Sequence, residues 1–241
     1  VLAVSPPLAA WARRRGATTA EVVPNGVDLD RFDPDRQRPQ TVALRRQLGL
    51  EGAVVMGFAG SLKPWHGVEV LLAAAASLAT SRPALRVLVV GDGPGRPDLE
   101  RRSAEDDHLA DRVVFTGTVN PALVPAYLGV FDVATAPFLP AEDFYFSPLK
   151  VVEAMAGGRP TVASRLAPIE AMLGSTGVLV PPGDPAALAR AIDELLADPS
   201  KAARLGEAAR RRAMDGHGWD KVAARILGSA ARARSASPVG A

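Results

Sequence analysis

Two lysines lie where the chain is predicted to pass into a helix, and a lysine at that place points to an anion. Lys63 lies in GSLKPWHG, residues 60–67, and Lys150 lies in SPLKVVEAMAGG, residues 147–158. The first turn of a helix exposes free N–H groups and the positive end of the helix dipole, so a lysine there costs about 0.3–1 kcal/mol unless an anion is near. Phosphate is the usual anion at such a position, and we expect one here.

The residues beside these lysines extend the hypothesis from one phosphate to a nucleotide. Ser61 and His66 accompany Lys63 and can also reach an anion at the start of the following helix. Two helix starts, each with a lysine, fit a diphosphate, and the carboxylate of Glu153 can accept two ribose hydroxyls. Two other interpretations stay open: Lys150 pairs only with Glu153, or Glu153 forms a buried ion pair with Lys150 or an arginine.

The segment around Lys150 predicts a short helix with defined ends. Ser147 suits the N-cap and Pro148 the first helical position, while Gly157 and Gly158 suit the end. We expect Lys150 and Glu153 on one edge of a mostly buried helix. The predicted apolar face consists of Leu149, Val151, Val152, Met155 and Ala156.

Composition limits the function classes. The chain has 241 residues, of which 48% are hydrophobic and 22% charged, with a formal net charge of +2, so a globular protein is expected and nucleic acid is not favoured. It has no cysteine, which excludes disulfides and thiolate metal sites. No apolar run reaches the roughly 18 residues that span a membrane. The chain begins with Val1, which suggests a piece of a longer protein.

Apolar strands alternate with helical patterns along most of the chain, which predicts a parallel sheet covered on both faces and a doubly wound α/β fold. Residues 25–28, NGVD, are interpreted as a left-handed turn, and residues 34–39 as a polar loop or linker. Strands are predicted at residues 1–5, 21–24, 53–59, 85–90, 112–115, 131–136, 160–163 and 177–180, and helices at 6–15, 68–79, 98–107, 121–128, 148–156, from about 168, 185–197, 200–214 and 219–232.

The end of the chain is predicted to be helical and then disordered. Residues 235–241, SASPVGA, form the expected disordered tail. The arginines of this region, Arg210, Arg211, Arg212, Arg225, Arg232 and Arg234, are interpreted as solvated helix faces.

A glycine follows each central strand, as the turns GDGPG at residues 91–95 and TGTV at 116–119 show. Neither these turns nor residues 60–67 form a Walker loop or a GxGxxG fingerprint, which argues against an NAD-dependent oxidoreductase. A non-catalytic binding or scaffold module with the same fold remains an alternative.

The ordered set of motifs resembles the carboxyl-terminal, donor-binding domain of glycosyltransferase family 4, a family with two Rossmann-like lobes of the GT-B type. The similarity covers nearly all of residues 1–230. It is carried by VPNGVDLDRF, GFAGSLKPWHGVEVLLAA, VVGDGP, VVFTGTV, EAMAGGRPTVAS, GVLVPPGDPAALARAI and GWDKVA.

The resemblance implies a site. The implied catalytic residues are Lys63, Lys150 and Glu153. The two lysines would supply the cations that the departing diphosphate needs, since no protein nucleophile is established for the family. Glu153 corresponds to the second Glu of the E-x7-E motif, which binds the donor ribose. The implied diphosphate-binding residues are Gly60, Ser61, Lys63, His66, Leu149 and Lys150, and the nucleoside-binding residues are Gly91, Gly93, Thr118, Val119 and Glu153.

The chain departs from the family in several places. Ser61 stands where the family usually has Arg, and His66 where it usually has Lys. The first Glu of E-x7-E falls on Tyr145, so either Glu142 or Asp143 replaces it or this sugar contact is absent. The expected donor-sugar residues are Glu142, Asp143, Tyr145, Phe146 and Ser147.

The resemblance also implies the organisation and activity of the protein. Residues 1–20 would be the end of an N-terminal lobe or the inter-lobe connection, residues 21–218 the nucleotide-sugar-binding domain, and residues 219–241 a crossing helix and tail. The expected reaction is retaining transfer from a nucleoside-diphosphate sugar to a glycan, lipid or small-molecule acceptor, with no cofactor, no metal and no nucleic acid. This piece alone is expected to be inactive. The expected location is the cytoplasm, and peripheral association with the inner face of the membrane is compatible with it.

Overall fold

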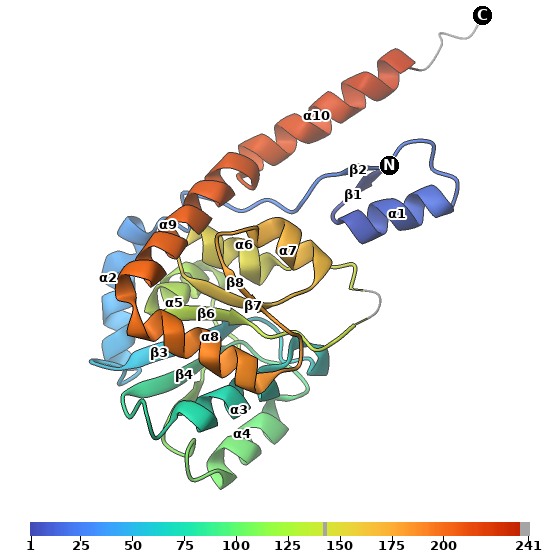
Figure 1. Ribbon diagram of the computed structural model, residues 1–241. Helices are drawn as coiled ribbons and strands as arrows, with labels where there is room; N and C mark the ends of the chain where they lie inside the picture. The colour runs from blue at the N-terminus through green and yellow to red at the C-terminus, as the bar shows by residue number, and fades with distance from the viewer. Residues whose placement is uncertain (142–143, 237–241) are drawn as a thin grey trace, which may run out of the picture.

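The computed structural model describes residues 1–141 and 144–236 and contains a six-stranded parallel sheet, as predicted (Figure 1). The strand order is β5-β4-β3-β6-β7-β8. The chain therefore builds outward from β3 in one direction and then returns to β6 to build in the other, which creates a switch point between β3 and β6. The strands are β3 (Val54–Ala59), β4 (Leu85–Val90), β5 (Val113–Phe115), β6 (Val133–Ala136), β7 (Thr161–Ser164) and β8 (Val178–Val180).

Helices cover both faces of this sheet, because each strand carries apolar residues on both sides (Figure 1). One core cluster joins Phe58 of β3 to α3 (Val68–Leu78), α4 (Arg96–Glu105) and α8 (Pro185–Ala197). The other cluster joins Val55 of β3 to α2 (Pro34–Gln47), α5 (Val124–Val130), α6 (Leu149–Ala156), α7 (Ala167–Leu173) and α9 (Pro199–Gly216).

The first residues form a separate unit in which β1 (Leu2–Ala3) pairs in parallel with β2 (Glu21–Val22) across α1 (Pro6–Arg14). The helix α10 (Trp219–Ala236) extends away from the body in Figure 1. Arg232 of α10 pairs with Glu21 of β2 at 2.8 Å, so α10 contacts the N-terminal pair of strands. The division at residues 20 and 218 stays a prediction.

The predicted loop at residues 34–39 is wrong, because this stretch begins α2. The carboxylate of Asp33 caps the helix by accepting from the backbone N–H groups of Asp35 and Arg36 at 2.9 and 3.3 Å. Pro34 occupies the tolerated first position, and Leu44 buries the far end in the core. Tertiary burial and the cap outweigh the weak helical pattern of a segment with a second proline.

Three further expectations about the elements are wrong. Gly26 has no positive φ, so NGVD is not a left-handed turn; a Cβ on Gly26 would lie 2.6 Å from the Trp219 ring. Helix α10 continues through Ser235 and Ala236, where the disordered tail was expected, and residues 237–241 lie outside the described residues. Finally, Arg210 is not on a solvated face, since it forms a half-buried ion pair with Asp33 at 2.7 Å.

Candidate functional site

A cavity of about 700 Å³ lies at the carboxyl ends of β3 and β4, beside the switch point of the sheet. It brings Lys63 and Lys150 together, although they are far apart in the sequence. Most of the predicted diphosphate and nucleoside residues also line it. The lining comprises Asn25, Ala59, Gly60, Ser61, Lys63, Trp65, His66, Val90, Gly91, Asp92, Thr118, Val119, Val124, Phe138, Phe146, Ser147, Pro148, Leu149, Lys150 and Glu153.

Lys150 contributes a buried amine without a hydrogen-bond partner. Its Nζ lies 3.9 Å from the centroid of the Phe58 ring and 4.9 Å from that of Phe138. Burial lowers the pKa of Lys150 to about 7, and the charge of Glu153 opposes this shift. Gly60 has φ +146°, and a Cβ there would lie 3.0 Å from Nζ, so the end of β3 passes directly over the amine.

Neither ion-pair interpretation of Lys150 and Glu153 holds. Among the ion pairs of residues 1–141 and 144–236, none includes either side chain. Burial raises the pKa of Glu153, while the positive charges of Arg31 and Lys150 oppose the rise. Both groups therefore face the cavity with their hydrogen-bonding capacity unused.

The loop before α3 supplies the second amine and an imidazole. Lys63 is exposed, and its Nζ lies 5.0 Å from the centroid of the Trp65 ring. His66 Nδ1 lies 2.5 Å from the carbonyl oxygen of Ser61. Burial lowers the pKa of His66, the charges of Lys150 and then Lys63 lower it further, and the bond to Ser61 opposes them. His66 thus lies within electrostatic reach of both lysines.

Only one of the two predicted helix starts reaches the cavity. A short 3-10 turn, Pro64–His66, separates Lys63 from α3. Gly67, which precedes α3, has φ +66°, and a Cβ there would lie 1.8 Å from the carbonyl oxygen of Pro137. The start of α3 is therefore packed against the chain that follows β6, and Gly67 is not among the residues that line the cavity.

The start of α6 does reach the cavity, but its cap differs from the prediction. Pro148, not Ser147, is the N-cap residue, and no side chain caps the helix. The Ser147 Oγ is buried without a partner, while its carbonyl oxygen accepts from Asn25 Nδ2 at 3.0 Å. Leu149 is 49% exposed rather than part of the apolar face, because the first turn borders the cavity. The free amides of α6 thus remain available to a ligand.

The glycines expected to leave room for a nucleotide have another function. A Cβ on Gly93 would lie 2.6 Å from the Leu62 backbone nitrogen, and one on Gly91 would lie 2.1 Å from the Gly60 carbonyl oxygen. They allow the turn after β4 to pack against the turn after β3. Gly91 still lines the cavity together with Thr118 and Val119, whereas Gly93 does not.

The expected sugar-binding residues are divided by the structure. Phe146 and Ser147 line the cavity. Tyr145 instead lines a separate cavity of about 490 Å³ with Trp11 and Arg14, and its carbonyl oxygen accepts from Ser5 Oγ at 2.6 Å. The prediction that Tyr145 contacts the sugar therefore has no support in this geometry. Glu142 and Asp143 lie outside the described residues.

Sequence reasoning missed Asn25, Trp65 and Phe138 in the lining of the cavity. The asparagine of the NGVD segment was a usable signal for Asn25, because an asparagine side chain can bond a distant backbone group as well as its own. Nothing local marked Phe138, whose ring packs edge-on against His66 with centroids 5.3 Å apart.

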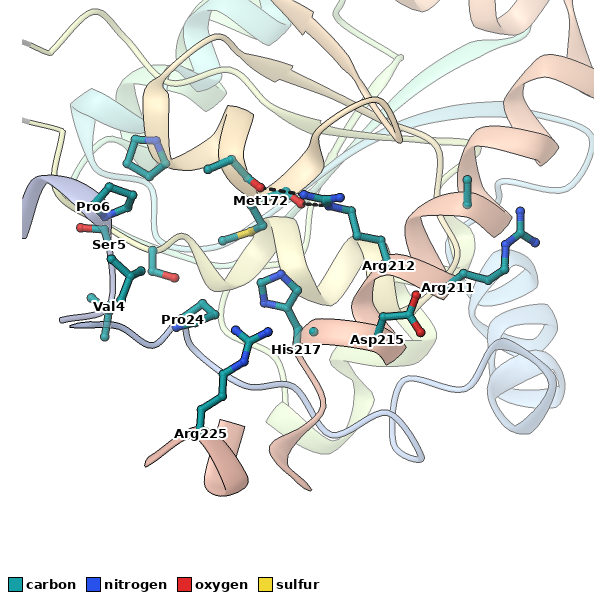
Figure 2. Close-up of a pocket in the computed structure, with 16 residues that line it drawn as sticks. Val4, Ser5, Pro6, Pro24, Met172, Arg211, Arg212, Asp215, His217 and Arg225 are labelled. Carbon is teal, nitrogen blue, oxygen red and sulfur yellow. Dashed lines mark hydrogen bonds between the residues drawn. The ribbon is translucent and has the colours of Figure 1, made fainter. Parts of the chain in front are cut away.

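A further cavity of about 570 Å³ lies between residues 4–24, α7, α9 and α10 (Figure 2). His217, which is 8% exposed, points into it, with Arg225 beside it. The guanidinium of Arg212 donates to the carbonyl oxygens of Met172 and Ala171 at 2.7 and 2.9 Å and so caps the end of α7. Arg212 is exposed, as predicted, and it also stabilises the end of α7.

In the part of the chain that the structure describes, no three His, Cys, Asp or Glu side chains gather as they would around a metal ion. None of its helices has both the length and the apolarity to cross a membrane.

A family model described as glycosyl transferases group 1 matches residues 53–198. The D-inositol 3-phosphate glycosyltransferase of Streptomyces avermitilis is 36% identical over 213 residues, which cover 84% of this chain and 44% of the relative. The GDP-mannose-dependent alpha-(1-6)-phosphatidylinositol monomannoside mannosyltransferase of Mycolicibacterium smegmatis is 35% identical over 212 residues, covering 86% and 54%. The chain thus spans about half the length of the curated relatives it matches.

Solved structures agree with this comparison. Sucrose-phosphate synthase from Thermosynechococcus elongatus has a TM-score of 0.80 at 31% identity, over 98% of this chain and 59% of the synthase. The Anabaena protein HepE, in complex with UDP-glucose, has a TM-score of 0.82 at 25% identity, over 96% of this chain and 63% of HepE. The fold is therefore that of the glycosyltransferase structures it matches.

Proposed function

The chain belongs to the glycosyl transferases group 1 family, and from this premise we propose that it is the donor-binding half of a retaining glycosyltransferase. It takes a nucleoside-diphosphate sugar, and the acceptor, a glycan, a lipid or a small molecule, is held by the other half of the protein. Family 4 is the proposed subgroup. The protein is proposed to act in the cytoplasm without metal or cofactor, and this half alone is proposed to be inactive.

One observation carries the proposal: the two lysines and the uncapped start of α6 line a single cavity at the carboxyl ends of the strands. Ligands of doubly wound folds bind at this edge. A buried amine without a partner is costly, and an anion is the ligand that would satisfy it. A diphosphate brings the required charge to both lysines at once.

The same groups suit the chemistry of sugar transfer. Negative charge grows on the departing diphosphate in the transition state, and fixed cations and amides aimed at it lower the barrier. Lys63, Lys150 and the first amides of α6 are proposed to do so, with His66 as a hydrogen-bonding neighbour. Glu153 is proposed to accept the ribose hydroxyls, which would give its unpaired carboxylate the donors that burial demands.

The comparisons support a nucleotide-sugar donor without naming the base. One relative is described as GDP-mannose-dependent, and one similar structure holds UDP-glucose. Thr118 and Val119 are proposed to lie beside the base, because they line the same cavity as the two lysines.

Thermal melting with UDP, GDP, ADP and NAD tests the proposal. A ligand at 100 times its dissociation constant stabilises by about 2.7 kcal/mol, which gives a readily measured rise in melting temperature. A rise with one nucleoside diphosphate, and none in the Lys63→Met and Lys150→Met variants at the same concentration, is expected. A rise with NAD alone would indicate an oxidoreductase, and no rise with any of the four would refute donor binding.

A non-catalytic nucleotide-binding module is the second candidate, and the position of Tyr145 favours it. This residue occupies the place of the sugar-contacting Glu and lines another cavity. Sugar transfer by the complete protein, with each of the UDP- and GDP-sugars as donor, separates the two candidates. Binding without any transfer would favour the module.

A further inference from the structure

Between the two lysine amines of the candidate site, that of Lys150 is the one shielded from solvent without a hydrogen-bond partner. Its Nζ is buried, has no hydrogen bond and lies between the rings of Phe58 and Phe138. No ion pair in the described part of the chain includes it. A charged ammonium in such surroundings loses its hydration and gains only the attraction of two rings, so the neutral amine is favoured there.

The charged groups around Lys150 do not change this balance. On α6 itself, Glu153 attracts the charge from more than an ion-pair distance. On the loop after β3, the imidazole of His66 and the ammonium of Lys63 share the cavity, and neither can neutralise a second cation. At the end of β4, the carboxylate of Asp92 is already paired with Arg96 at 3.1 Å.

We propose that Lys150 is uncharged in the free protein above neutral pH and takes up one proton when a nucleoside diphosphate enters the cavity. This inference rests on the proposed function and adds a property to it: donor binding is proton-coupled. The incoming phosphate oxygens provide both an opposite charge and acceptors for the ammonium protons, so the charged form becomes the stable one. Departure of the nucleoside diphosphate returns the proton to solvent, and no other group need be oxidised, reduced or transferred.

The number of protons taken up on binding depends on how much of Lys150 is already charged in the free protein. Because the pKa of Lys150 is about 7 without ligand, roughly a tenth of the amine is charged at pH 8. If bound phosphate returns the pKa to its ordinary range, binding takes up about 0.9 proton at pH 8. The affinity then falls about tenfold for each pH unit between 7.5 and 9.5. The terminal phosphate of the ligand has already lost its last proton in this range, so it adds nothing to the slope.

Isothermal titration calorimetry measures this uptake directly. The ligand is whichever of UDP, GDP and ADP gives the largest melting shift, and it is titrated at pH 8 in HEPES and in Tris, two buffers with different ionisation enthalpies and no phosphate to compete for the cavity. The difference between the two binding enthalpies gives the number of protons taken up. About 0.9 is expected for the unmodified protein, and none for Lys150→Met at concentrations high enough to saturate it.

His66→Gln is the matched control, because the imidazole of His66 lies in the same cavity and is another group that could take up a proton there, although burial lowers its pKa. This variant is expected to keep the uptake at pH 8. Uptake that is lost in His66→Gln and kept in Lys150→Met would overturn the inference, as would equal binding enthalpies in the two buffers for the unmodified protein. Failure of all three nucleotides to bind would instead refute the proposed function, so the two failures are distinguishable.

Discussion

Replacing Lys150 by Met should raise the free energy of unfolding of the free protein while it weakens nucleotide binding. The structure gives the size of the gain in stability. Burial lowers the pKa of Lys150 from 10.5 to about 7, and a tenfold change in a protonation constant corresponds to about 1.4 kcal/mol. Holding the ammonium in the folded protein therefore costs about 4 kcal/mol at pH 7. Methionine has nearly the same length, fits between Phe58 and Phe138, and carries no charge to desolvate.

The pH dependence of this gain follows from the direction of the shift. The folded-state pKa of Lys150 is depressed, so between about pH 7 and 10.5 the unfolded chain binds more protons than the folded one. The unmodified protein therefore gains stability as the pH rises through this window. Below about pH 7 the amine is charged in the folded protein, and the full cost of burying the ammonium is present. The advantage of Lys150→Met is expected to be constant below pH 6.5 and to shrink by about 1.4 kcal/mol per pH unit between 7.5 and 9.5.

Urea unfolding of both proteins at half-unit steps from pH 6 to 9.5 measures this difference. Lys63→Met is the matched control, because its amine lines the same cavity but is exposed, and a change within about 0.5 kcal/mol is expected for it. A Lys150→Met protein that is less stable than its parent, or an advantage that stays flat across the alkaline range, would refute the argument that the amine is buried without a partner.

Three further outcomes are expected. In the complete enzyme, Lys63→Ala or Lys150→Ala should slow sugar transfer by at least about tenfold, because each removes a cation from the departing diphosphate, and normal turnover by both would remove this assignment. Transfer should be unchanged by EDTA, since the proposed chemistry relies on protein cations; loss of activity that Mg²⁺ or Mn²⁺ restores would contradict it. Gly67→Ala should cost more than 3 kcal/mol in urea unfolding, because its Cβ would lie 1.8 Å from a carbonyl oxygen, whereas Gly49→Ala, with the same φ of +66° and nothing within 4 Å, should cost about 1 kcal/mol; equal costs would show that the contact relaxes.

The fold could be predicted from the sequence because its signals are local. Continuous apolar runs such as residues 54–59 and 87–90 belong to strands buried on both faces, and helical patterns between them require parallel pairing. The segment at 34–39 was misassigned because its helix depends on burial of Leu44 against α5, which a polar, proline-flanked stretch does not show. The Asp33-Pro34 pair was a readable signal for the start of this helix.

Part of the lining of the candidate site was predictable from the sequence, whereas the burial and protonation of its residues were not. Lysines at residues 63 and 150, each before a helical pattern, were enough to expect a shared anion site, because the carboxyl ends of parallel strands meet at one edge. Sequence could not show that one lysine is exposed and the other buried. That difference depends on Phe58 and Gly60 at the end of β3 and on Phe138 after β6, which are far from Lys150 or from each other in the sequence.

By itself, then, the sequence determined which residues carry charge and which segments must be buried, since both are properties of residue type and spacing. Only the tertiary structure decided which charged groups are desolvated, and at which positions a neighbouring backbone leaves room for glycine alone. Asn25 bonding to Ser147, and Arg210 to Asp33, join positions more than a hundred residues apart. Desolvation and close packing depend on such distant neighbours, and no local pattern in the sequence records them.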